Sequence, residues 1–193
     1  MIFLFINLIY SKNSTNTTSP TQFNISQKYI TRNPNFSGDW EYGGQLSIVP
    51  HTKQILLANT TNSTGYIFLT QRLPSEYWLS SIDISCPSDT KSKIGIWMTK
   101  DFGQLGTAFG GPETFHGVGI LLFHNQTNLS IEIRENDGHA NYSSDDFFPS
   151  IVKELPTNEI SLIINYTSPI LTIDLNISNS ITNIYHDRPR IKV

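Results

Sequence analysis

Apolar residues recur at every second position through much of this chain, and β-branched and aromatic residues dominate these runs. The clearest run is Leu171-Thr172-Ile173-Asp174-Leu175-Asn176-Ile177, in which every apolar residue is followed by a polar one. Strict alternation is typical of a sheet that packs on one face and meets water on the other. Thr167-Ser168-Pro169 predicts a hairpin turn between this strand and 162–166. We therefore expect an all-β fold, an antiparallel β-sandwich of the jelly-roll type, with one helical turn between Phe148 and Leu155.

Composition divides the 193 residues into four segments. Residues 1–11 are mostly apolar but too few to span a bilayer, which takes about 20 residues, so we expect a signal peptide; an apolar terminus without a targeting role is the alternative. Residues 12–35 are rich in Ser, Thr, Asn and Pro, which predicts a disordered spacer. We place the folded domain at 36–178 and a polar, basic tail at 179–193.

Charge and glycosylation motifs narrow the class of partner. With 13 basic and 16 acidic residues, the net charge is -3 and no long run of either sign occurs, so we do not expect a nucleic-acid partner. Asn-x-Ser/Thr sequons are frequent for a chain of this length. They start at Asn13, Asn16, Asn24, Asn35, Asn59, Asn62, Asn125, Asn128, Asn141, Asn165 and Asn176. This frequency favours a protein of the secretory pathway.

Cys86 is the single cysteine, so the chain cannot form an intrachain disulfide. Period-two spacing puts Cys86 on the same face of a strand as Ile82 and Ile84. We expect it to be buried as a small apolar side chain, with a reactive thiol or an intermolecular disulfide as the alternatives.

Several glycine- and tryptophan-containing motifs carry a family resemblance. They are Trp40 with Gly44, Gly65-Tyr66-Ile67-Phe68, Trp78 with Ile82-Asp83-Ile84, Gly95-Ile96-Trp97, Phe109-Gly110, His116-Gly117-Val118-Gly119-Ile120 and Asn136-Asp137-Gly138. From about Trp40 to Ile177 the chain resembles the L-type, legume-lectin-like domain of membrane-bound cargo lectins. That resemblance implies a concanavalin A-like sandwich that recognises high-mannose glycans on glycoproteins leaving the endoplasmic reticulum. The resemblance stops before the last family strands, so we expect either a fragment of a longer protein or a minimal protein whose sandwich closes in another way.

The resemblance also implies which residues contact sugar. Ser92 stands where the family has a sugar-binding Asp, Asn125 follows the run that carries the family's calcium ligands, and Asp137 matches the Asp of the Asn-Asp-Gly motif. We therefore predict Ser92, Asn125 and Asp137 as the carbohydrate-binding residues.

Calcium is a cofactor of the family, but two positions argue against it here. Phe123 stands where the family has a ligating Asp, and Arg134 stands where it has a binding-site His. Calcium needs six to eight oxygen ligands, which a phenyl ring and a guanidinium cannot supply. We expect no metal and no other cofactor, with Asp137 as the single matching ligand position.

These observations predict a non-catalytic protein that binds glycans or glycoprotein cargo in the lumen of the endoplasmic reticulum and Golgi, or after secretion. No transmembrane anchor is expected within the chain, and the oligomeric state stays open. One alternative is a degenerate lectin fold that acts as a structural or protein-interaction module. The other is a jelly-roll glycoside hydrolase, which would need paired carboxylates such as Glu132 or Asp83.

Trp97 and the glycines near it have two possible roles. The indole could stack on a sugar ring, but we expect it to lie in the core between the two sheets. Gly110, Gly111, Gly117 and Gly119 are expected to permit tight turns and close packing.

Asp145-Asp146 could form a cation-binding loop, although a solvated acidic turn over Phe147 and Phe148 is the simpler expectation.

Overall fold

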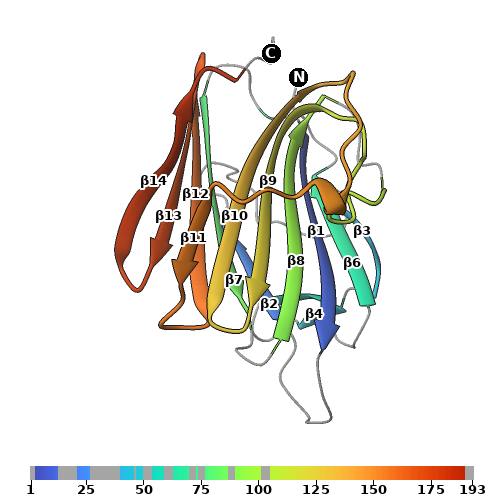
Figure 1. The fold of residues 1–193 in the computed structure, drawn as a ribbon, viewed down its shortest axis with the longest axis vertical. Coiled ribbons are helices and arrows are strands. Elements are labelled where there is room, and N and C mark those ends of the chain that lie inside the picture. Colours follow the sequence, from blue (N-terminus) through green and yellow to red (C-terminus); the bar gives the residue numbers. More distant parts are fainter. Residues whose placement is uncertain are drawn as a thin grey trace.

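In the computed structural model, two antiparallel seven-stranded sheets pack face to face (Figure 1). The structure describes residues 3–12, 21–26, 40–45, 47–49, 54–58, 63–69, 73, 77–86, 90–100 and 105–189. The first sheet has the order β11-β10-β9-β8-β1-β6-β3, and the second has the order β14-β13-β12-β7-β2-β5-β4. These elements confirm the all-β sandwich that the alternating sequence predicts.

The strand bounds are as follows. The first sheet contains β1 (Phe3–Lys12), β3 (Trp40–Gly44), β6 (Ser63–Leu69), β8 (Thr90–Thr99), β9 (His116–Asn125), β10 (Asn128–Asp137) and β11 (Ile151–Glu154). The second sheet contains β2 (Thr21–Ser26), β4 (Ser47–Val49), β5 (Gln54–Ala58), β7 (Tyr77–Ser85), β12 (Glu159–Thr167), β13 (Ile170–Ile177) and β14 (Ser180–Asp187).

The main core lies between the two sheets and is built by the period-two pattern. Ile94 and Ile96 of β8 and Ile120 of β9 point from the first sheet toward Leu162 and Ile173 of the second. All five side chains are fully buried, so each contributes about 1.5 to 3 kcal/mol of hydrophobic stabilisation. The residues between them on each strand therefore face outward, and on the first sheet these outward positions form the candidate site.

One hairpin in each sheet fixes the register of neighbouring strands, and the hairpin of the first sheet carries the candidate site. Strands β9 and β10 pair directly from His116 with Asp137 at one end to Asn125 with Asn128 at the other. Their turn is Gln126-Thr127, and Gln126 adopts a positive φ of 60°. In the second sheet β12 pairs with β13, which confirms the predicted hairpin around Thr167-Ser168-Pro169.

The N-terminal part of the chain differs from the predicted segments. Phe3–Lys12 forms β1, which lies between β8 and β6, where a signal peptide was expected for 1–11. A short apolar run is typical of β-strands as well as of signal peptides, so composition alone does not separate the two. The expected spacer 12–35 contains β2, and its residues 13–20 and 27–35 lie outside the described residues.

The C-terminal part also differs from the prediction. The segment 179–193, expected to be a polar tail, contains the edge strand β14, while residues 190–193 lie outside the described residues. An edge strand is exposed and can be polar, which explains why its composition resembles a tail. The expected helical turn between Phe148 and Leu155 is wrong, because Ile151–Glu154 is the strand β11. A short 3-10 turn, η1 (Ser144–Asp146), lies just before it.

Two further expectations concern burial and membrane spans. Cys86 is 1% exposed, which confirms its predicted burial, and loss of hydration raises the pKa of its thiol to about 12. Among the residues that the structure describes, no helix is long and apolar enough to cross a bilayer.

Candidate binding face of the first sheet

The outer face of the first sheet is divided into a covered part and an open part. The segments 105–115 and 138–150 fold back over this face, and Figure 1 shows the second of them crossing β10, β9 and β8. Five aromatic side chains on or beneath these segments, which we call the aromatic cover, pack against one another. They are Trp97, Phe109, Phe115, Tyr142 and Phe147.

Trp97 is the centre of the aromatic cover. Its side chain is fully buried, and its ring meets Phe115 edge to face at 4.8 Å between centroids. A Cβ placed on Gly111 would lie 2.3 Å from Nε1 of the indole, and a Cβ placed on Gly119 would lie 2.5 Å from its Cζ3. The predicted burial of Trp97 is therefore confirmed, but its expected place between the sheets is wrong, since it lies on the outer face beneath 105–115. A fully buried indole cannot stack on a sugar.

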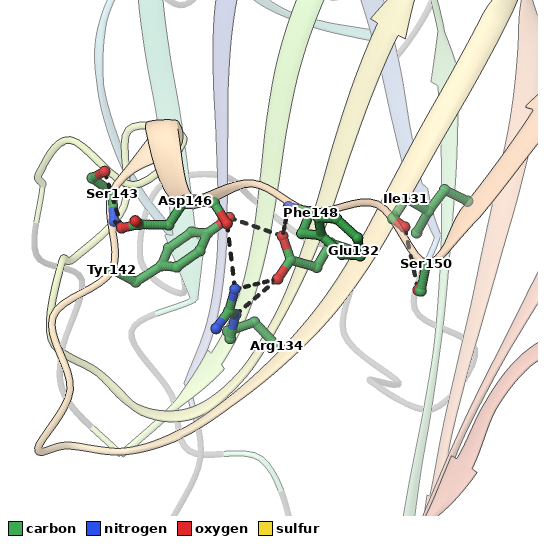
Figure 2. Close-up of polar contacts among 8 residues, drawn as sticks. All are labelled: Ile131, Glu132, Arg134, Tyr142, Ser143, Asp146, Phe148 and Ser150. Atoms are coloured by element: carbon green, nitrogen blue, oxygen red, sulfur yellow. Dashed lines mark hydrogen bonds and ion pairs between the residues drawn. The ribbon is translucent and has the colours of Figure 1, made fainter.

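Glu132 holds the second covering segment on the sheet (Figure 2). Its Oε2 accepts hydrogen bonds from the Tyr142 hydroxyl at 3.0 Å and from the Phe148 backbone N–H at 2.8 Å. Its Oε1 forms an ion pair with Arg134 at 2.6 Å, and the Arg134 guanidinium lies 4.6 Å from the centre of the Tyr142 ring. Burial and the neighbouring Glu132 carboxylate raise the pKa of Tyr142 above its usual range, so its hydroxyl remains a donor.

The turn η1 is closed by its own polar groups. Ser143 and Asp146 form a reciprocal capping box, in which Asp146 Oδ2 accepts from the Ser143 N–H at 2.8 Å and the Ser143 hydroxyl accepts from the Asp145 N–H at 3.2 Å. The hydrogen bonds from Ser143 lower the pKa of the Asp146 carboxyl. Both carboxylates are exposed, as the predicted acidic turn requires, and Phe147 packs beneath it into the aromatic cover, whereas Phe148, also expected beneath the turn, is 80% exposed.

Beyond the aromatic cover, the same face is open at the end of the sheet where β9 turns into β10. Two cross-strand rows of residues reach this end of the sheet. In the first row Asn125 of β9 lies between Lys91 of β8 and Asn128 of β10. In the second row Phe123 of β9 lies between Lys93 of β8 and Ser130 of β10. We call these six residues the open face. Asn128 is exposed and the other five are partly exposed, so their polar groups can meet a ligand. On β11 the rows continue to the exposed residues Glu154 and Val152.

An aromatic ring lies among these polar groups. Phe123 is half-buried and meets Phe147 edge to face at 6.3 Å between centroids. Lys93 Nζ lies 5.5 Å from the centre of the Phe109 ring, a cation–π distance. Amides, a hydroxyl and ammonium groups beside one phenyl ring can bind the hydroxyls and the apolar side of a sugar ring.

The structure does not bring the three predicted sugar-binding residues together. Asn125 lies on the open face, whereas Ser92 points between the sheets and is 1% exposed. Asp137 pairs with His116 at the far end of the hairpin, nine residues along β10 from Asn128, or roughly 30 Å. Its carboxylate accepts a hydrogen bond from the His139 N–H at 3.1 Å and so closes a turn. One sugar cannot contact all three residues.

Sequence reasoning missed Lys91, Lys93, Asn128 and Ser130 as candidate residues. The signal was present, because period two on β8 places Ser92 with the buried Ile94 and places both lysines on the opposite face. A family motif at Ser92 does not show which face of the strand the residue occupies, whereas the strand period does.

The open face does not fit a calcium ion. None of its six residues is a carboxylate and two are lysines, so it has neither the charge nor the oxygen ligands that calcium needs. Among the described residues, no cluster of three or more His, Cys, Asp or Glu side chains is arranged to hold a metal.

The carboxylates considered for glycoside hydrolysis do not form a pair. Glu132 lies on the outer face of the first sheet with both oxygens occupied, while Asp83 lies on β7 of the second sheet and accepts from the Ser161 hydroxyl at 2.6 Å. Hydrolysis needs two carboxyl groups on either side of one bond, within about 10 Å. These two residues on different sheets do not meet that requirement.

A surface depression lies on the second sheet. It has a volume of about 380 Å³ and is lined by Asn165, Thr167, Ser168, Ile170, Thr172 and His186. The Thr172 hydroxyl and His186 Nδ1 are 3.0 Å apart and hydrogen-bonded, so part of its polar lining is already satisfied. This depression is the alternative candidate binding site to the open face.

Comparison with known proteins agrees with this architecture. The family model described as legume-like lectin family matches residues 16–186. The chain is 28% identical over 114 residues to mouse (Mus musculus) protein ERGIC-53, an alignment that covers 53% of this chain and 21% of that relative. The chain therefore spans about a fifth of the relative it matches. Because the family match covers most of the residues, including β2 and nearly all of β14, this chain belongs to the legume-like lectin family.

Proposed function

We propose that this protein binds carbohydrate, without catalysis, through the open face of its first sheet. The observation that carries the proposal is the pair of cross-strand rows in which Asn125, Asn128 and Ser130 surround Phe123. Amide and hydroxyl groups match the paired donors and acceptors of sugar hydroxyls, and the phenyl ring matches the apolar side of a pyranose. Family membership supports the same ligand class.

The finer proposal is recognition of mannose-type glycans on glycoprotein cargo in the lumen of the endoplasmic reticulum and Golgi. Its support is the resemblance to cargo lectins together with the similarity to mouse protein ERGIC-53. Binding is independent of calcium, because the open face has no carboxylate for the ion.

A second candidate is a protein-interaction module that has lost sugar binding. The aromatic cover favours it, because the chain's own segments fill part of the outer face and bury Trp97. In that case the open face is the exposed remainder of a site that no longer works.

A glycan panel separates the two candidates. The chain is produced in a bacterial host, so that its sequons carry no glycan, and is tested with and without a chelator. Asn125→Ala and Asn128→Ala should each weaken binding about tenfold, because each variant loses roughly one net hydrogen bond to the sugar. Asn158→Ala is the matched control, because its exposed side chain lies in the turn between β11 and β12. Absence of binding to every glycan favours the interaction module, and binding abolished by the chelator contradicts the calcium argument.

A further inference from the structure

Two lysines form a positive stripe at one side of the open face. Lys91 and Lys93 alternate with the buried Ser92 and Ile94 on β8, so both point outward, about 7 Å apart along the strand. Both are partly buried, which keeps their ammonium groups near the sheet. The whole chain has a net charge of -3, whereas these two adjacent lysines give this part of the sheet face a positive charge.

Neutral residues flank this stripe on both neighbouring strands. Asn125 and Phe123 lie opposite the lysines on β9, and Ser11 and Ile9 hold the corresponding register positions on β1. Among the described residues Arg134 forms an ion pair with Glu132, and neither lysine forms one. Glu154, in the same row as Lys91, is three strands away, or about 14 Å, which exceeds the screening length of about 8 Å in physiological salt.

The aromatic cover places one of these cations at the border of the open face. Lys93 Nζ lies 5.5 Å from the centre of the Phe109 ring, so its ammonium group lies beside the aromatic cover. A ring face attracts a cation weakly and leaves its N–H donors free on the solvent side. Among the described residues no carboxylate forms an ion pair with Lys93, so a negatively charged group on a bound ligand can reach its ammonium there.

We propose that the open face prefers acidic saccharides, meaning sugars that carry a carboxylate, sulfate or phosphate. This inference rests on the proposed carbohydrate binding and names its ligand class. The oxyanion lies against Lys91 and Lys93, while ring hydroxyls contact Asn125, Asn128 and Ser130. Charge-assisted hydrogen bonds are about twice as strong as neutral ones, so the anionic group adds affinity and selects the ligand.

Calorimetric titration with matched probes tests this preference. The probes are a neutral mannose disaccharide and the same disaccharide bearing one phosphate, one sulfate or one uronic acid group. We expect at least one acidic probe to bind tenfold or more tightly than the neutral one at low salt, with a smaller ratio at high salt. Lys91→Gln and Lys93→Gln should each reduce that ratio toward one. Lys153→Gln is the control, because Lys153 lies opposite Leu129 on the other face of the same sheet and the ratio should stay unchanged.

The possible results of the titration distinguish the acidic preference from carbohydrate binding itself. Equal affinity for neutral and acidic probes overturns the acidic preference and leaves carbohydrate binding in place. No affinity for any probe overturns both. An unglycosylated acidic peptide that binds as tightly as the acidic disaccharides shows general anion binding, and this also overturns the proposed ligand class. If Lys153→Gln lowers the ratio as much as the open-face variants do, the stripe is not the source of the preference.

Discussion

The hydroxyl of Tyr142 donates a hydrogen bond to Glu132 across 3.0 Å, and this contact ties the segment after β10 back onto that strand. The same carboxylate accepts from the Phe148 N–H, so one side chain fixes the segment on both sides of η1. The extent of the aromatic cover, and hence of the open face, therefore depends on Glu132.

Replacing this carboxylate should loosen the cover. Glu132→Gln removes the charge from hydrogen bonds to Tyr142, Phe148 and Arg134, which should lower the free energy of unfolding by about 2 kcal/mol in urea titrations. Amide hydrogen exchange in 138–150 should become faster at the same time. Glu154→Gln, at an exposed edge position, is the control. Equal effects of the two variants would show that Glu132 does not hold the segment.

Close packing around Trp97 gives a second prediction. Gly119→Ala places a methyl group 2.5 Å from Cζ3 of the indole, and such overpacking should cost about 1 to 3 kcal/mol of stability. Combining it with Trp97→Phe should recover part of that loss, because the smaller ring makes room. The measurement is a double-mutant cycle by urea unfolding. Strictly additive losses would contradict a clash between these two residues.

His124 predicts a dependence of stability on pH. Its side chain is fully buried between the sheets, and loss of hydration lowers its pKa below the usual 6.5. As the pH falls below 6.5, the unfolded chain takes up a proton at His124 before the folded protein does, so stability falls toward acid, by at most about 1.4 kcal/mol per pH unit. Urea unfolding between pH 7.5 and 5.0 measures this slope. His124→Gln should flatten it, and the exposed His139→Gln should not; an unchanged slope in His124→Gln would refute the assignment.

The position of β1 makes removal of the N-terminus costly. A chain that starts at Lys12 lacks nearly all the backbone pairs that β1 forms with β8 and β6. Because each net hydrogen bond contributes about 1 kcal/mol, the loss should be at least about 3 kcal/mol in urea unfolding, or the transition should cease to be cooperative. The control truncation ends at Asp187, the last residue of β14. Identical unfolding of the full chain and the Lys12 chain would mean that β1 is dispensable, as a signal peptide would be.

Sequence reasoning predicted the sandwich because burial on one face imposes a two-residue period, visible in Leu171 to Ile177. It did not predict β1, because an apolar run without a clear two-residue period is typical of a signal peptide as well as of a strand. It placed Trp97 in the wrong layer for a related reason. The alternation shows that Trp97 and Ile96 face opposite sides, but only tertiary packing shows that a loop also covers the outer side.

The candidate site was less predictable than the fold. Asn125 lies on the proposed open face, at the end of a clear strand beside a turn, and its role in binding stays a prediction. Asp137 does not lie beside Asn125, because the turn at Gln126-Thr127 fixes the register of β10 and a ten-residue strand then carries Asp137 to the opposite end of the hairpin. A motif match contains no information about that distance.

Backbone amide chemical shifts during a glycan titration test the central claim most directly. The ¹⁵N-labelled, unglycosylated chain is titrated with an acidic and a neutral mannose disaccharide, and the amides whose shifts change are assigned. Carbohydrate binding by the open face predicts the largest changes at Lys93, Phe123, Asn125 and Ser130. Changes confined to Thr172 and His186 on the second sheet, or no changes at millimolar disaccharide, would contradict it.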